Sequence, residues 1–117
     1  MKQTQVIFSE DAEEVYEYLT QKANSSKIER TILRAIDVKV ELIKKNIHYG
    51  NAIAKRLIPT KYRMKYGITN LYRVELPMFW RMLYTITEEG NSVEIIAFVL
   101  DVVDHKEYNR LFGYKKK

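Results

Sequence analysis

The chain contains no cysteine, which excludes a disulfide framework, a thiol nucleophile and thiolate metal ligands. Its only histidines are His48 and His105, so a zinc site is not expected. The most apolar run, residues 93–103, is interrupted by Glu94 and Asp101 and is too short to span a bilayer. The sequence also lacks a signal-peptide pattern, a glycine-rich phosphate loop and a GxSxG motif. We therefore expect a cytoplasmic protein without membrane association.

The composition is that of an ordinary folded protein, with 46% hydrophobic and 30% charged residues. At 117 residues, the chain is expected to form a single domain over residues 1–117. A chain of this length buries roughly two-thirds of its unfolded surface, which is enough for a real core.

Acidic residues are missing from a long central interval, between Glu41 and Glu75. The interval carries eight cations: Lys44, Lys45, Lys55, Arg56, Lys61, Arg63, Lys65 and Arg73. Five acids lie instead within the first 20 residues: Glu10, Asp11, Glu13, Glu14 and Glu17. Such segregation concentrates positive potential on one region and favours a polyanionic partner, although a solvated basic surface without a partner is the alternative.

The N-terminal half predicts a strand followed by a helical hairpin. Residues 5–8 read as a short strand, and Ser9 is a suitable N-cap for a helix with an apolar stripe. Ser26 and Glu29 have the spacing of a capping box at the start of a second helix of about twenty residues. The short connector between two amphipathic segments predicts an αα-hairpin.

The C-terminal half predicts a meander of strands. Residues 71–76, 80–87 and 92–103 read as strands, with a turn at 77–79 and a hairpin turn at 88–91. The connector at 55–67 holds either a helical turn or a short strand. The order predicts an α+β fold in which the helix hairpin packs on one face of a small twisted, mainly antiparallel sheet and leaves the other face partly open.

Alternation along the two central strands separates apolar from charged side chains. Tyr72, Val74, Leu76, Trp80, Met82, Tyr84 and Ile86 form the set expected against the helices. Arg73, Glu75 and Arg81 are expected to share the opposite face, with Leu83 and Thr85. Two neighbouring guanidinium groups repel unless an anion lies between them, and that anion is either Glu75 or a phosphate. Ordinary cross-strand ion pairing is the simpler interpretation.

The segment KYRMKY, residues 61–66, alternates cations with aromatic rings. Such a pattern suits stacking on unpaired bases together with contacts to backbone phosphates. The alternative is that Tyr62 and Tyr66, one helical turn apart, cover the edge of the core. The candidate RNA-binding set is Lys55, Arg56, Lys61, Tyr62, Arg63, Lys65, Tyr66 and Lys106.

The element order, the strand pair NLYRVEL…FWRMLYTI and the ending DVVDHKEYNRLF together resemble the RelE/ParE superfamily of type II toxin–antitoxin systems. The resemblance covers most of the chain and rests on the combined order rather than on one motif. It implies a RelE-like mRNA interferase, an endoribonuclease that inhibits translation by cutting mRNA on the ribosome. It also implies that no metal or other cofactor is needed, and that a cognate antitoxin protein covers the basic face.

The resemblance also implies roles for particular residues. Arg81, in FWRMLY, matches the phosphate-stabilising arginine, and Arg73 matches a basic position on the preceding strand. His105 and Tyr108 lie in the C-terminal segment where the family places a late catalytic residue, and Lys106 stands where an arginine is expected. Glu75 departs from the family's lysine, which removes a cation and leaves either Glu75 or His105 as the base.

Two alternative functions are compatible with part of this pattern. A ParE-like toxin has the same fold but poisons DNA gyrase without nuclease chemistry. A catalytically inactive module binds RNA or the ribosome only. The combination of His105, Arg81 and Tyr108 favours the nuclease, whereas Glu75 favours the rivals.

Overall fold

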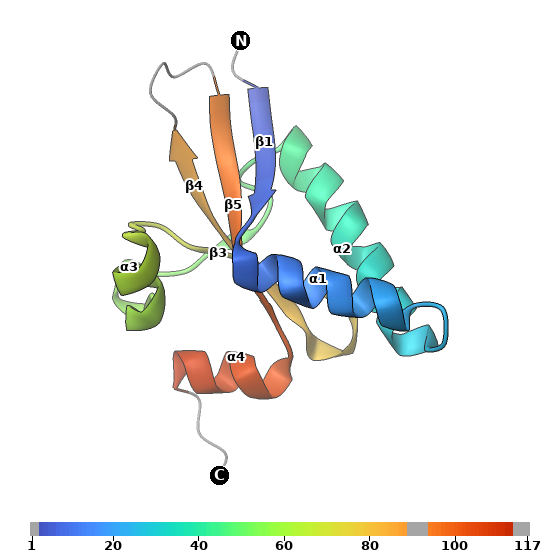
Figure 1. The fold of residues 1–117 in the computed structure, drawn as a ribbon. Helices are drawn as coiled ribbons and strands as arrows, with labels where there is room; N and C mark the ends of the chain where they lie inside the picture. The colour runs from blue at the N-terminus through green and yellow to red at the C-terminus, as the bar shows by residue number, and fades with distance from the viewer. Residues whose placement is uncertain (1–2, 89–93, 114–117) are drawn as a thin grey trace.

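The computed structural model describes residues 3–88 and 94–113 and has an α+β fold, as predicted (Figure 1). Its five-stranded sheet has the order β1-β5-β4-β3-β2. The strands are β1 (Gln3–Phe8), β2 (Asn51–Ala52), β3 (Tyr72–Glu75), β4 (Arg81–Glu88) and β5 (Glu94–Val103). Among the described strands, only β1, which is parallel to β5, breaks the antiparallel pattern. The turn predicted at 88–91 lies almost wholly outside the described residues.

The predicted helical hairpin is confirmed as α1 (Glu10–Lys22) and α2 (Lys27–Lys45). Ser9 caps α1 as expected, because its hydroxyl accepts from the backbone N–H of Ala12 at 3.0 Å. The predicted capping box at Ser26 is wrong. Ser26 Oγ donates to the Glu29 carboxylate instead of accepting a backbone N–H of α2.

The remaining helices are short. The connector is helical and contains a 3₁₀ turn, η1 (Lys55–Leu57), and α3 (Thr60–Tyr66). A second 3₁₀ turn, η2 (Pro77–Phe79), joins β3 to β4, and the C-terminal tail forms α4 (His105–Phe112). In Figure 1, α3 lies at the side of the sheet and α4 lies at its lower end, below α1. Among the described residues, no helix is long and apolar enough to cross a membrane.

The main core lies between the hairpin and one face of the sheet. Helix residues such as Leu19, Ile36 and Ile43 are fully buried against Met82 and Tyr84 of β4. Tyr72, Trp80 and Ile86 pack against the same cluster. The apolar side chains of β3 and β4 therefore pack against the helical hairpin, as the alternation in the sequence predicted.

The opposite face is less open than predicted. A second buried cluster occupies much of it, formed by Ile58, Tyr62, Leu71, Leu83, Val103 and Tyr108. These residues come from the connector, from the sheet and from α4, so α3 and α4 close over the apolar part of this face. Thr85, expected among the charged residues, is also buried here, and its hydroxyl donates to the backbone carbonyl of Asn70 at 2.8 Å.

Candidate functional site

The candidate site lies at the end of the sheet where β3 turns into β4. Register pairs Glu75 with Arg81 and Arg73 with Leu83, so the three charged side chains project from one face at adjacent positions. The predicted grouping of Arg73, Glu75 and Arg81 is thus confirmed. We call these three residues together with Tyr108 the arginine cluster.

Glu75 forms the centre of the arginine cluster. Its carboxylate lies 3.3 Å from Nε of Arg73 and 3.5 Å from Nε of Arg81. The Glu75 side chain is 55% exposed, whereas those of Arg73 and Arg81 are 30% and 14% exposed. The carboxylate therefore faces solvent above two largely covered guanidinium groups, and the three groups together carry one net positive charge.

Tyr108 supports the two arginines from α4. Its ring lies beneath Arg81, with 4.6 Å between the guanidinium carbon and the ring centroid, a cation–π distance. Its hydroxyl accepts a hydrogen bond from Nη1 of Arg73 at 3.0 Å. Tyr108 is only 2% exposed, so it positions the guanidinium groups and does not itself reach solvent. The structure therefore places Tyr108 at the predicted site but in a supporting position.

His105 approaches the same end of the sheet as the first residue of α4. Its ring centroid lies 5.7 Å from that of Phe79, in the turn between β3 and β4. The side chain is exposed, and its Nε2 lies 3.2 Å from the side-chain nitrogen of Asn109. His105 therefore presents an exposed imidazole beside the turn that joins β3 to β4.

A shallow hollow of about 230 Å³ extends the site toward the sheet edge. Arg73 and Glu75 form one side of it, and Lys39, Tyr49 and Asn51 contribute to the other. Lys39 Nζ donates to the hydroxyl of Tyr49 at 2.9 Å. Sequence reasoning missed these residues, because Lys39 belongs to α2 and its spacing from β3 carries no signal of proximity.

Gly50 allows this edge to approach the sheet closely. A Cβ at that position would lie 2.9 Å from the Tyr84 ring and 3.0 Å from the backbone oxygen of Arg73. The Gly50 N–H donates to the hydroxyl of Tyr84, which donates in turn to the carbonyl of Ile47. Burial raises the pKa of Tyr84, so this phenol stays protonated and serves as a structural link.

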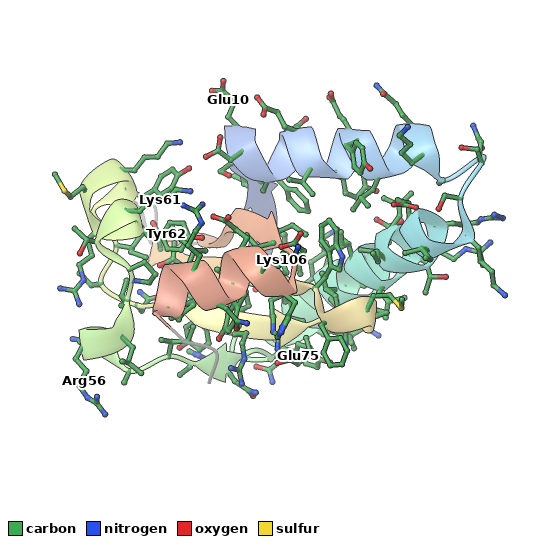
Figure 2. All side chains as sticks on the ribbon, turned by 90° about the horizontal axis from the view of Figure 1, so that it is seen from below. Glu10, Arg56, Lys61, Tyr62, Glu75 and Lys106 are labelled. Carbon is green, nitrogen blue, oxygen red and sulfur yellow. The ribbon has the colours of Figure 1, made fainter. Side chains whose placement is uncertain are left out.

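The basic connector is only partly available for nucleic acid. Tyr62 is 1% exposed, so its ring covers the core and cannot stack on a base. Tyr66 is half-buried and packs on the same second cluster. Arg63 donates to the backbone carbonyl of Lys55. The side chains of Lys55 and Arg56 are exposed, and Figure 2 shows Arg56 pointing away from the fold.

Lys65 is held by an acid of α1. Its ammonium group lies 2.8 Å from a carboxylate oxygen of Asp11. The hydrogen bond between them lowers the pKa of Asp11 and raises the pKa of Lys65. One acid of the N-terminal group is therefore paired with one cation of the connector in the folded chain, which reduces the net potential of the connector.

Lys106 lies on a different side of α4 from the arginine cluster. It lines an open groove of about 770 Å³ between α1 and α4, together with Asp11, Glu14, Lys61 and Arg110. Figure 2 shows Lys106 on the α1 side of α4, while Glu75 projects on the other side. The structure therefore does not bring Lys106 to the predicted phosphate site.

The described residues contain no group of three or more histidine, aspartate or glutamate side chains arranged to hold a metal ion. Comparisons with protein-family models, with curated proteins and with solved structures gave no significant match to this chain.

Proposed function

We propose that this protein is the toxin component of a type II toxin–antitoxin system, a RelE-like endoribonuclease that cuts mRNA on the ribosome. The observation that carries the proposal is the convergence of Arg73 and Arg81, from neighbouring strands, on one exposed carboxylate. His105 from α4 contributes an exposed imidazole at the same end of the sheet. These groups supply the positive charge and the proton-transfer capacity that phosphodiester cleavage requires.

In the proposed reaction, a ribose 2′-hydroxyl attacks the adjacent phosphorus and loses its proton to the Glu75 carboxylate. The bond from phosphorus to the 5′ oxygen breaks, and protonated His105 gives its proton to that oxygen. The products are a 2′,3′-cyclic phosphate and a 5′-hydroxyl end. Arg81 and Arg73 stabilise the charge that accumulates on the phosphoryl oxygens, and Tyr108 keeps both guanidinium groups in place.

A ParE-like toxin that acts on DNA gyrase is the second candidate. It is favoured by one specific observation, namely that Glu75 already neutralises part of the charge of both arginines. In that case the arginine cluster is a structural ion pair, and the surface that meets the target lies elsewhere. In either case we propose a cytoplasmic protein neutralised by a cognate antitoxin.

The deciding experiment is induced expression in bacterial cells, followed by primer extension on an abundant translated mRNA. The wild type is compared with Arg81→Lys, which keeps the charge but loses bidentate phosphate contact, and with Glu75→Gln. Arg34→Ala, which removes an exposed arginine from α2, is the matched control. Thermal unfolding of each purified variant verifies that it is folded.

We expect cuts at fixed positions within codons for the wild type and for Arg34→Ala. Cleavage should fall by about 100-fold or more in Arg81→Lys and Glu75→Gln, as expected when a group that acts in the transition state is removed. Growth arrest without mRNA cuts, accompanied by gyrase-dependent DNA breaks, would instead establish the second candidate. Undiminished cutting by both site variants would exclude the arginine cluster as the active site.

A further inference from the structure

The turn that connects β3 to β4 presents two large apolar side chains to solvent. Phe79 is 69% exposed and Met78 is 56% exposed. Phe79 is the most exposed aromatic side chain in the part of the chain that the structure describes. Because Met78 and Phe79 are adjacent and both exposed, burial in the core does not account for either side chain.

The backbone of this turn is strained. Met78 and Phe79 have φ values of 61° and 62°, in the left-handed region that non-glycine residues rarely adopt. Such a conformation costs on the order of 1–3 kcal/mol for each residue and persists only where the surroundings impose it. Two consecutive large residues therefore occupy positions where glycine would be less strained.

Several contacts hold the strained turn in one shape. Nη1 of Arg81 donates to the carbonyl of Phe79 at 2.6 Å. The backbone N–H of Leu76 donates to the carbonyl of Trp80 at 2.9 Å, and Pro77 fixes its own φ at the first position of the turn. The Phe79 ring is therefore presented by a rigid support that is attached to the arginine cluster.

The surroundings of Phe79 combine an aromatic surface with positive charge. The carbonyl of Phe79 accepts a hydrogen bond from Arg81. The centroid of the Phe79 ring lies 5.7 Å from that of the His105 ring. An aromatic platform beside cations is the arrangement that binds single-stranded nucleic acid, because the base stacks and the cations contact the phosphate. A purely apolar protein partner would gain nothing from the adjacent guanidinium and imidazole groups.

We propose that Phe79 is a stacking platform for an unpaired RNA base, next to the phosphate held at the arginine cluster. Met78 widens the platform. The inference rests on the proposed function for its choice of RNA, and it adds a specific base-binding position that the catalytic groups do not require.

The test is direct binding of short 2′-O-methyl RNA oligonucleotides, which cannot be cleaved because the attacking hydroxyl is blocked. An abasic oligomer of the same length and charge is measured in parallel, both at fixed low salt. The wild type is compared with Phe79→Gly and Phe79→Trp. Ile28→Ala, which removes an exposed apolar side chain from α2, is the control.

We expect Phe79→Gly to weaken binding of the base-containing oligonucleotide by roughly tenfold or more, the usual size of one stacked base. Binding of the abasic oligomer should change little, Phe79→Trp should preserve affinity, and Ile28→Ala should match the wild type. The melting temperature of Phe79→Gly should be unchanged or raised, because glycine relieves the strain at φ 62°. A ring needed only for folding would give the opposite shift.

Three results would overturn the inference: equal losses for both oligomers in Phe79→Gly, unchanged binding of both, or no measurable binding by the wild type. Unchanged binding accompanied by loss of affinity for a co-purified protein partner would assign the turn to protein recognition. The two proposals fail separately. Base-dependent binding without mRNA cuts rejects the nuclease and keeps the platform, whereas cuts without base-dependent binding reject the platform alone.

Discussion

The two faces of strand β4 differ although their residues alternate along the same stretch of chain. Met82 and Tyr84 turn toward α1 and α2 and enter a continuous apolar core. Arg81 and Leu83 turn toward α3 and α4, where Leu83 is fully buried while Arg81 takes part in the arginine cluster. One face is therefore apolar from Met82 to Ile86, whereas the other is charged at Arg81, next to the turn, and apolar at Leu83.

This difference suggests how a small protein combines stability with a charged site. The apolar part of the second face, around Leu71 and Leu83, holds α3 and α4 against the sheet. The same α4 then brings Tyr108 under the arginines and His105 beside Phe79. The second cluster thus both adds to the core and positions the groups of the candidate site.

The largest expected losses of stability come from truncating a buried side chain on either face of β4. Met82→Ala and Leu83→Ala each remove a fully buried side chain, and each should lower the free energy of unfolding by about 2–5 kcal/mol. Chemical denaturation measures both values. If Leu83→Ala costs far less than Met82→Ala, α3 and α4 are loosely attached, and the two faces are not equivalent as cores.

Two buried tyrosines, Tyr84 and Tyr108, allow the two faces to be compared through single hydrogen bonds. Tyr84→Phe leaves the N–H of Gly50 and the carbonyl of Ile47 without their phenolic partner, and each such loss costs about 1–3 kcal/mol. Tyr108→Phe removes one acceptor from Arg73, which keeps its ion pair with Glu75 and is partly exposed to water. The cost should therefore be smaller, about 1 kcal/mol.

Thermal and denaturant unfolding of the two phenylalanine variants tests this order. The aromatic ring is retained in both, so each variant reports the hydroxyl group alone. A larger loss from Tyr108→Phe would mean that the arginine cluster, and not the edge near Gly50, is the more strongly coupled polar network. Equal losses would indicate that water replaces neither hydroxyl group well.

The sequence predicted those features of the fold that depend on periodicity. Alternation with a period of two places Arg73, Glu75 and Arg81 on one face of β3 and β4, because a strand offers no other arrangement. Apolar spacing of three and four likewise predicted a second helix of nearly the observed length. Both patterns are local, so tertiary packing had little scope to override them.

Features that depend on contacts distant in sequence were missed. Single-sequence spacing does not show that α3 and α4 cover the second face, that Lys39 reaches the site, or that Lys65 pairs with Asp11. One missed element did have a local signal. Asp104 and Glu107 have cap spacing, and the Asp104 carboxylate accepts from the Glu107 N–H at 2.9 Å at the start of α4.

The smallest expected effect concerns the ion pair that joins α1 to α3. The pKa of Asp11 is lowered from its ordinary value of 3.8, so folding favours the ionised carboxylate. This stabilising contribution is fully present above pH 3.8 and disappears as the pH falls through the lower pKa of the folded state. Asp11→Asn should therefore lower the melting temperature slightly at pH 7, and the difference from the wild type should shrink as the pH falls below 3.8.

Glu10→Gln is the matched control, because it removes another acid from the first turn of α1. Both substitutions weaken the favourable interaction with the helix dipole, and only Asp11→Asn also removes the partner of Lys65. The difference between the two variants at pH 7 thus isolates the ion pair, and it should shrink in high salt because both partners are substantially exposed. Equal melting temperatures would show that the contact between α1 and the basic connector adds nothing measurable, and that Lys65 is available to a polyanion.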